Sequence, residues 1–354
     1  MEMGEKTRSL LIEHYKAYPE LQIQDVFKYL YQSSFGCEHL ISSLGRVTDY
    51  IAEEYKSVEN DSPIKIEALD GNYSRVYLSC LNTGINIETF GKLFFLSSKT
   101  ESDGSFNLEK KISVAKELVC EGILPFSPAD FEREVDDWKN KCYPAVHHSN
   151  IFREKYKPAY RLISNDFVVF LPLFAELDKK LSLGSVCLAV EGGSACGKTT
   201  LGMLLEKLYD CNVFHMDDFF LQPHQRTPER FAEVGGNVDR ERFLSEVLQP
   251  LKTGNDISYR RFNCSTMTIE EPIQIPLKKL TVVEGAYSMH PELEKFYDYS
   301  IFLDVNENLQ KARIEKRNVP FLAKRFFEEW IPLEKIYFEK TNVKQRCDSV
   351  IEIK

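Results

Sequence analysis

The stretch from residue 186 to residue 200 decides the fold of this chain; it reads Val186-Cys187-Leu188-Ala189-Val190-Glu191-Gly192-Gly193-Ser194-Ala195-Cys196-Gly197-Lys198-Thr199-Thr200. An apolar run leads into a glycine loop with the spacing G-x-x-x-x-G-K-T, and leucines at helical intervals follow it. In a strand–loop–helix context, the backbone N–H groups of such a loop bind polyphosphate at a helix N-terminus. We therefore predict a nucleotide site comprising Gly192, Gly193, Ser194, Ala195, Cys196, Gly197, Lys198, Thr199 and Thr200. Lys198 would contact the β- and γ-phosphates, and the Thr199 hydroxyl would bind Mg²⁺.

Outside this loop, the C-terminal half alternates short apolar segments with amphipathic ones. The expected strands are 186–190, 212–216, 280–284, 300–304 and 349–353, and the expected helices are 199–209, 240–251, 306–317 and 321–341. Short, mostly apolar strands between amphipathic helices are typical of a parallel sheet that is covered on both faces. The pattern predicts an α/β P-loop NTPase fold with flanking helices.

The N-terminal half has a different pattern. Apolar residues recur at helical spacing in two series, Leu40-Leu44-Val47-Ile51-Tyr55 and Leu108-Ile112-Ala115-Val119. Val76, Leu78 and Cys80 alternate with polar residues and predict one short strand. We expect a mainly α domain at 1–180 and a P-loop domain at 184–354, with the boundary in the polar segment 178–185.

Composition excludes several classes of protein. The 354 residues are 43% hydrophobic and 28% charged, with a net charge of −9, which indicates a globular protein that lacks the basic excess of nucleic-acid or membrane-surface binders. The nine cysteines form no C-x-x-C pair, which indicates thiols in a reducing cytosol. The start of the chain is polar, and the longest apolar run, 167–177, is broken by Pro172. We expect a cytoplasmic protein with no membrane span.

Acidic residues follow two of the expected strands. Asp217 comes after the second strand, where a carboxylate can position an acceptor hydroxyl and take its proton; alternatively it caps the next element. Glu284 ends the third strand in a Walker B-like way and could hold the hydration shell of Mg²⁺ or orient the acceptor. The alternative for Glu284 is a buried acid bound to Thr199 or Lys198.

A basic helix face follows the fourth expected strand. Arg313, Lys316 and Arg317 share one face, and could cover the triphosphate as a lid and stabilise phosphoryl transfer. The alternative is a solvated helix whose cations pair with Glu307 or Glu315.

Residues 186–353 resemble the uridine kinase-like P-loop kinases, a family that includes pantothenate kinase, phosphoribulokinase and nicotinamide riboside kinase. The resemblance rests on 192–200, 216–220 (Met-Asp-Asp-Phe-Phe), 237–239 (Asn-Val-Asp), 283–288 (Val-Glu-Gly-Ala-Tyr-Ser), 297–298, 302–304 and the basic lid. It implies transfer from ATP or GTP, with Mg²⁺, to a hydroxyl of a small molecule, of which a nucleoside is the best class. It further implies Asp217 as base, Asp239 on sugar hydroxyls, Glu284 as the Walker B-like acid, Arg313 and Arg317 as lid arginines, and Tyr259 and Arg261 in the acceptor segment.

The chain also departs from that family. Arg317-Asn318 stands where the lid usually ends in Arg-Asp, and Cys264 lies near the place of the histidine that reads a pyrimidine base. The polar loop 225–236 could belong to a different acceptor pocket. Uridine itself is therefore not implied, and a vitamin, a sugar phosphate or nicotinamide riboside are alternative acceptors.

The N-terminal half lies outside the resemblance. His147 and His148, near Arg153 and Arg161, could bind a phosphate or a second substrate, or could simply be surface histidines of a loop. Cys37 and His39 could form a reactive pair, but the sequence assigns no third partner. We expect this half to cover the acceptor side or to form a homo-oligomer contact. A further alternative is a nucleotide-dependent switch whose N-terminal domain binds a partner.

Overall fold

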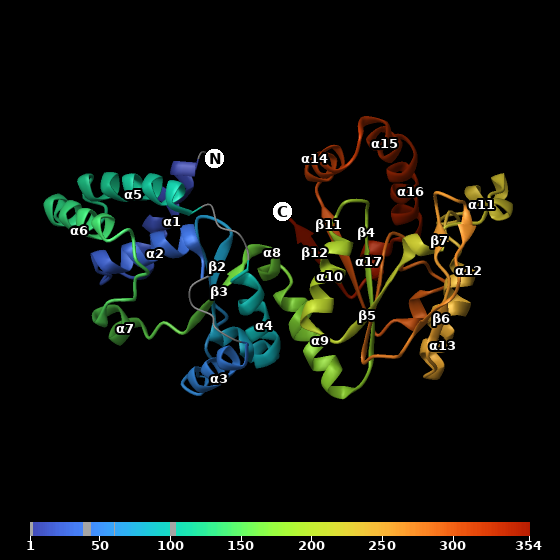
Figure 1. Ribbon diagram of the computed structural model, residues 1–354, viewed down its shortest axis with the longest axis horizontal. Coiled ribbons are helices and arrows are strands. Elements are labelled where there is room, and N and C mark those ends of the chain that lie inside the picture. Colours follow the sequence, from blue (N-terminus) through green and yellow to red (C-terminus); the bar gives the residue numbers. More distant parts are fainter. Residues whose placement is uncertain (1–2, 38–43, 60, 100–103) are drawn as a thin grey trace. The chain divides into compact units, whose positions relative to one another are not determined.

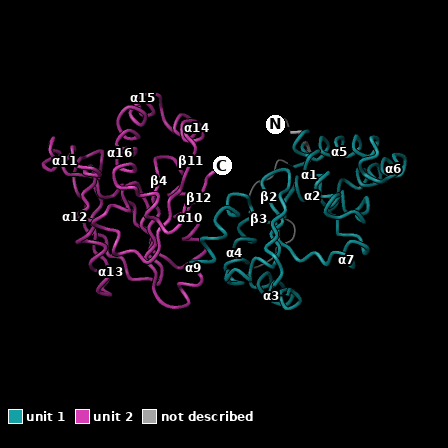
Figure 2. The backbone as a smooth tube through the Cα atoms, turned by 180° about the vertical axis from the view of Figure 1, so that it is seen from behind, with its two compact units in different colours: residues 1–176 teal, residues 177–354 magenta. Residues whose placement is uncertain are grey.

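The computed structural model describes residues 3–37, 44–59, 61–99 and 104–354, and it separates into two compact units. Unit 1 is Met1–Glu176 and unit 2 is Leu177–Lys354 (Figure 2). The segment 178–185, expected as a polar linker, is mostly helical, because α9 runs from Leu171 to Leu183. Leu171, Phe174 and Leu177 are buried at helical spacing, so the helix continues where polarity alone indicated a loop.

Unit 2 contains the parallel sheet that the sequence predicts (Figure 1). Its strands are β4 (Val186–Gly192), β5 (Cys211–His215), β10 (Leu280–Glu284), β11 (Tyr299–Val305) and β12 (Ser349–Ile353), in the order β12-β11-β4-β10-β5. Every residue of β4 is buried, as expected for a central strand with helices on both faces. The chain passes from β4 to β5 on one side of β4 and later from β10 to β11 on the other side. Ligands of open α/β sheets bind where the strand order reverses in this way, beyond the carboxyl ends of the strands.

The helices of unit 2 also follow the predicted pattern, with two interruptions. They are α10 (Lys198–Leu208), α11 (Pro228–Ala232), α12 (Arg240–Phe243), α13 (Gln249–Thr253), α14 (Glu307–Arg317), α15 (Pro320–Arg325), α16 (Ile331–Thr341) and α17 (Val343–Arg346). The expected helices 240–251 and 321–341 each contain a π-helical turn, at 244–248 and 326–330. Pro250 and Pro332 follow these turns, and a proline cannot donate the regular α-helical hydrogen bond.

The faces of this sheet are covered differently. Helix α10 packs against β4, β5 and β10. A hydrophobic cluster includes Ala189, Phe214, Val283 and Phe302 of the sheet together with Tyr337 of α16. Two small hairpins lie between β5 and β10 in the chain, β6 (Ile257–Tyr259) with β9 (Ile273–Ile275) and β7 (Phe262–Asn263) with β8 (Thr268–Ile269).

Unit 1 is mainly helical, as predicted, but it holds more sheet than the single strand we expected. Strands β1 (Ile66–Ala68), β2 (Tyr73–Tyr77) and β3 (Tyr160–Ser164) form an antiparallel sheet. Val76 lies in β2, whereas Leu78 and Cys80 lie in a 3₁₀ helix, Leu78–Thr83. An alternation of only three apolar residues could not distinguish the strand from the tight helix after it. The helices are α1 (Met3–Ala17), α2 (Ile23–Phe35), α3 (Leu44–Tyr55), α4 (Ile87–Ser97), α5 (Gly104–Cys120), α6 (Pro128–Asn140), α7 (Asn150–Tyr156) and α8 (Asn165–Val168).

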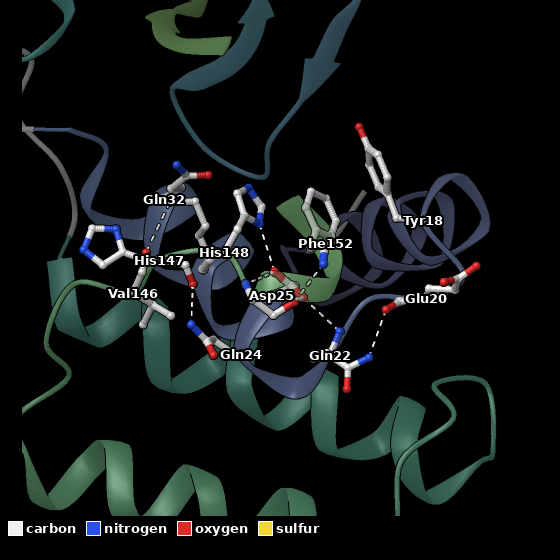
Figure 3. Close-up of polar contacts among 12 residues, drawn as sticks. Tyr18, Glu20, Gln22, Gln24, Asp25, Gln32, Val146, His147, His148 and Phe152 are labelled. Atoms are coloured by element: carbon white, nitrogen blue, oxygen red, sulfur yellow. Dashed lines mark hydrogen bonds and ion pairs between the residues drawn. The ribbon is translucent and has the colours of Figure 1, made fainter. Parts of the chain in front are cut away.

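The two histidines of unit 1 that we considered as a phosphate site do not act as a pair. His147 is exposed, and its ring points away from that of His148, which is buried and contacts Asp25 (Figure 3). The His148 ring stacks on Phe152 with ring centroids 4.1 Å apart, and its Nδ1 lies 2.9 Å from Asp25 Oδ1. His39 and Leu40, which we also considered, lie outside the described residues.

Burial of His148 predicts acid sensitivity of unit 1. Burial lowers the His148 pKa to about 4, although Asp25 opposes this shift. The unfolded chain, with an ordinary histidine pKa, therefore binds a proton that the folded chain does not, and stability is lost as pH falls from about 6.5 towards 4. We expect a loss of about 2 kcal/mol between pH ~7 and pH ~5 from this residue.

Urea unfolding followed by Trp138 fluorescence in a Trp330→Phe background checks this, because Trp138 is then the remaining tryptophan and lies in unit 1. His14 is also buried with a lowered pKa, so the informative quantity is the difference between His148→Gln and its parent. An equal loss of stability in both proteins would contradict the assignment.

Candidate active site

The glycine loop lies at the carboxyl end of β4 and leads directly into α10. Gly192 has φ +149°, and a Cβ there would lie 2.7 Å from the Leu303 carbonyl oxygen and 2.8 Å from Cys196 Sγ. Gly197 has φ +109° and immediately precedes α10. At Gly192 a side chain would clash with its neighbours, so only glycine fits there. At both positions the positive φ also favours glycine. The loop directs the N-terminus of α10 towards the crevice, as phosphate binding requires.

Lys198 folds back over the loop. Its Nζ donates to the carbonyl oxygens of Gly192 at 2.8 Å and Gly193 at 2.9 Å. Burial opposes its charge, but the Cys196 thiol and the carboxylates of Glu334 and Glu284 outweigh burial and raise the Lys198 pKa. The ammonium is thus charged and held at the loop, where it can move to a phosphate oxygen.

Thr199 and Glu284 meet where the sequence predicts a metal site. The Thr199 hydroxyl donates to Glu284 Oε1 at 2.9 Å, and His215 Nδ1 lies 2.5 Å from the same oxygen. The hydrogen bond to Glu284 raises the His215 pKa. Hydroxyl and carboxylate oxygens are ligands that Mg²⁺ accepts, and this ion commonly takes one or two carboxylates together with nucleotide phosphates. Within the described ranges, no group of three or more His, Cys, Asp or Glu side chains forms a metal site.

Asp217 and Asp218 follow β5 in a short 3₁₀ turn, Met216–Phe219. The Asp217 side chain is accessible to solvent, yet protein atoms crowd it, and this desolvation raises its pKa; Lys198 opposes the shift and Glu284 adds to it. Asp217 is therefore close enough to Lys198 for the charge of the ammonium to act on its pKa. The carboxylate therefore lies near the P-loop and remains open on one side.

The predicted acceptor segment contacts the second aspartate. Tyr259 donates its hydroxyl to Asp218 Oδ2 at 3.4 Å, and Arg261 Nε lies 3.3 Å from the same oxygen. Arg261 Nε also donates to the Tyr259 hydroxyl at 3.2 Å. The structure therefore gathers Tyr259 and Arg261 beside the aspartate pair, on the hairpin that carries β6.

Asp239 has a different environment from the one that the resemblance implies. It is 2% exposed and caps α12, accepting the Arg242 backbone N–H at 3.2 Å, while its other oxygen lies 3.3 Å from Arg242 Nε. The Arg242 guanidinium lies 4.4 Å from the Phe219 ring centroid and donates to the Asp218 carbonyl oxygen. Asp239 thus orients Arg242 and the 218–219 backbone instead of facing an acceptor.

The two lid arginines of α14 also separate. Arg313 Nη1 donates to the carbonyl oxygens of Ala195 at 3.2 Å and Cys196 at 3.3 Å. Arg317 is exposed, and its guanidinium lies 5.8 Å from the centroid of the Phe326 ring. The structure therefore brings Arg313, but not Arg317, to the phosphate loop.

Sequence reasoning missed Glu191, whose carboxylate binds backbone N–H groups of the glycine loop and of the segment after β10. It is fully buried and accepts the backbone N–H groups of Gly192 and Met289 and the Tyr337 hydroxyl. Burial raises its pKa to about 7. An acid at the end of an otherwise apolar strand was the signal that could have revealed it.

Sequence reasoning also missed Glu334 of α16, which accepts a hydrogen bond from a backbone amide of the glycine loop. Its carboxylate accepts the Ser194 backbone N–H at 2.9 Å and the Ser194 hydroxyl at 2.6 Å. A backbone amide of this loop is the kind of donor that phosphate oxygens use. Nothing in the local sequence of α16 marks the contact, because the two residues are 140 positions apart.

Neutralising Glu334 should tighten nucleotide binding. Glu334→Gln keeps an oxygen acceptor for Ser194 but removes a negative charge from the phosphate loop, so we expect the Kd for Mg·ATP to fall by roughly threefold to tenfold. Isothermal titration calorimetry measures this, and Glu339→Gln, at an exposed position of the same helix, is the matched control. Weaker binding by Glu334→Gln alone would mean that the carboxylate supports the loop instead of competing with phosphate.

Part of this chain is similar in sequence to a known protein. No family model matches the chain. Phosphoribulokinase from Synechocystis sp. (strain ATCC 27184 / PCC 6803 / Kazusa) is 25% identical over 130 residues, which are 35% of this chain and 39% of that protein, so the chain spans well under half of this relative.

Solved structures align with about half of the chain. A possible uridine kinase from Bacillus stearothermophilus covers 50% of this chain and 99% of its own length at 21% identity, with a TM-score of 0.38. Shikimate kinase from Acinetobacter baumannii, in complex with shikimate, covers 48% and 84% at 18% identity, with a TM-score of 0.29. In its ordered motifs and in the parallel sheet around the glycine loop, roughly half of the chain is similar to the uridine kinase-like P-loop kinases.

Proposed function

We propose that unit 2 transfers the γ-phosphoryl group of ATP or GTP to a hydroxyl group of a small molecule, with a nucleoside as the first acceptor class. The observation that carries the proposal is the convergence of Lys198, the Thr199–Glu284 pair and Asp217 at the carboxyl ends of adjacent strands. A nucleotide switch needs the first two features, but it needs no carboxylate on the acceptor side.

Each group has a chemical task in this proposal. Asp217 accepts a hydrogen bond from the acceptor hydroxyl and takes its proton as the phosphoryl group moves. Lys198 and Arg313 neutralise charge that spreads over the transferring phosphoryl oxygens. Thr199 and Glu284 would hold Mg²⁺, which when bound supplies further positive charge at the phosphates. Arg317 would contribute only if α14 moved.

A phosphorylated acceptor, such as a sugar phosphate, is the second candidate. Burial raises the Cys264 pKa, Arg226 opposes this shift and Asp217 adds to it, so Cys264 lies within electrostatic reach of both charged residues. A guanidinium on the acceptor side, with Arg261 beside Asp218, would bind the phosphate of such an acceptor.

The deciding experiment is ADP release by the full chain with Mg·ATP and Mg·GTP against nucleosides, sugar phosphates and vitamins. Stimulation by one acceptor that is lost in Asp217→Asn would establish the reaction and its acceptor class.

Arg226→Gln should raise the KM of a phosphorylated acceptor and leave the KM of a neutral acceptor unchanged. If ATP binds but no acceptor stimulates its turnover, the kinase proposal fails and the switch, with a partner for unit 1, takes its place.

A further inference from the structure

Unit 1 contains a cavity that the kinase proposal does not use. It has a volume of about 510 Å³ and lies among α2, α3, α4 and β3, within the usual size range of small-molecule sites. One wall is polar and carries Lys28, Gln32, His148 and Tyr160. The lining of the cavity also includes apolar side chains, among them Val47, Phe94 and Leu162.

The polar wall is held in place by a hydrogen-bonded chain of side chains. His148 Nδ1 faces Asp25 Oδ1 at 2.9 Å, and its Nε2 lies 2.8 Å from the Tyr160 hydroxyl (Figure 3 shows the Asp25 contact). A carboxylate can only accept, so the neutral ring carries its proton on Nδ1, and Nε2 accepts the Tyr160 proton. Asp25 is itself fixed by the Ser149 hydroxyl at 2.7 Å. The Tyr160 oxygen is therefore oriented without help from a ligand.

The same wall carries positive charge with little compensation. The Lys28 ammonium donates to the Val146 carbonyl oxygen at 3.2 Å and forms no ion pair with another residue in the described part of the chain. Behind Gln32 and Tyr160 lies Arg75, which is fully buried. Its Nε donates to Gln32 Oε1, its guanidinium lies 4.9 Å from the Tyr160 ring centroid, and its Nη2 has no hydrogen-bond partner among the residues described.

Carboxylates balance part of this charge, but Glu67, Glu54 and Glu53 pair with Arg75, Arg161 and Lys56 instead of with Lys28. Glu67 lies 3.3 Å from Arg75 Nη1, and Glu54 at the cavity pairs with Arg161 at 2.8 Å. Burial, together with Arg75 and Arg153, lowers the Lys28 pKa to about 8, and the Asp25 carboxylate opposes this shift without cancelling it. A bound anion would supply a charge-assisted hydrogen bond at this position.

We propose that this cavity binds a small organic anion, with its carboxylate or phosphate group against Lys28 and its apolar body against Val47, Phe94 and Leu162. The site gives unit 1 a ligand of its own. It does not depend on the proposed kinase reaction, because every residue that forms it belongs to unit 1.

The test is calorimetric titration of the full chain with benzoate and with phenyl phosphate, using benzyl alcohol as the neutral analogue. We expect saturable binding of at least one anion and no comparable binding of the alcohol. Lys28→Met should weaken binding at least about tenfold by removing the charged donor. Lys16→Met, at an exposed position of α1, should leave binding unchanged. Lys198→Ala should also leave it unchanged, which separates this site from the phosphate loop.

The proposal is overturned if the alcohol binds as tightly as the anions, if Lys28→Met binds like the parent, if Lys198→Ala abolishes binding, or if no anion binds at concentrations up to about 10 mM.

The pH dependence of binding to the wild-type protein provides a second measurement should Lys28→Met fail to fold. Benzoate keeps its charge above neutral pH, so its affinity should fall as Lys28 loses its proton near pH 8. Of the other groups near Lys28, Asp25 and His148 have lowered pKa values, and Tyr160 and Arg75 have raised ones. A flat profile would also overturn the proposal.

Discussion

Replacing Lys198 with alanine should reduce the kcat/KM of phosphoryl transfer by a factor on the order of 10³. In this structure the ammonium is already charged and held by the Gly192 and Gly193 carbonyl oxygens, within the loop that would receive the phosphates. Its movement to a phosphate oxygen would place a positive charge where negative charge develops, and losses of this size follow from removing one such group.

Steady-state ADP release measures this effect once the acceptor is known, and ATP binding should be measured alongside. Lys207→Ala is the matched control, because Lys207 is an exposed lysine on the same helix, α10. Circular dichroism should show that Lys198→Ala is folded, since the substitution also leaves two loop carbonyls without their donor. A folded Lys198→Ala protein with parental kcat/KM would remove Lys198 from the reaction.

Asp217→Asn should lower kcat by roughly 10²- to 10⁴-fold while leaving the Kd for Mg·ATP within a few-fold of the parent. The asparagine keeps the size of the side chain but cannot take a proton from the acceptor hydroxyl. Asp217 reaches Lys198 only through electrostatic interaction, and Thr199 is bonded to Glu284 instead, so nucleotide binding should depend on it weakly.

Asp218→Asn is the matched control for the adjacent carboxylate. Asp218 is bonded to Tyr259 and lies beside Arg261, so its substitution should act mainly on the KM of the acceptor. The pair of variants thus separates proton transfer from acceptor binding. If Asp218→Asn lost kcat and Asp217→Asn did not, the two roles would have to be exchanged.

The fold of unit 2 was predictable because its signals are local. A strand buried on both faces must be apolar along its length, and β4, β10 and β11 read that way. The glycine loop is also a local signal, since its backbone angles exclude other residues at Gly192 and Gly197. The weaker predictions failed where the pattern was short, as in the 3₁₀ helix after β2, or where polarity suggested a linker within α9.

The candidate site was predictable only in part. Thr199 and Glu284 come together because parallel strands end at one edge of the sheet, as motif position indicated. Tyr259 and Arg261 lie beside Asp218 because the hairpin that carries β6 brings them there. Motif position could not indicate that the Asp239 carboxylate binds Arg242. An aspartate that caps a helix and one that binds an acceptor hydroxyl can stand in the same local sequence.

The sequence by itself determined the P-loop, the strands that position it and the family to which roughly half of the chain is similar. Only the tertiary structure decided which distant side chains share a hydrogen bond. Glu334 reaches Ser194 across 140 residues, and His148 reaches Asp25 across 123. Periodicity reports which face of an element is buried, but the partner of a buried polar group depends on how separate elements pack. This packing linked Glu334 to the P-loop and assembled the cavity of unit 1.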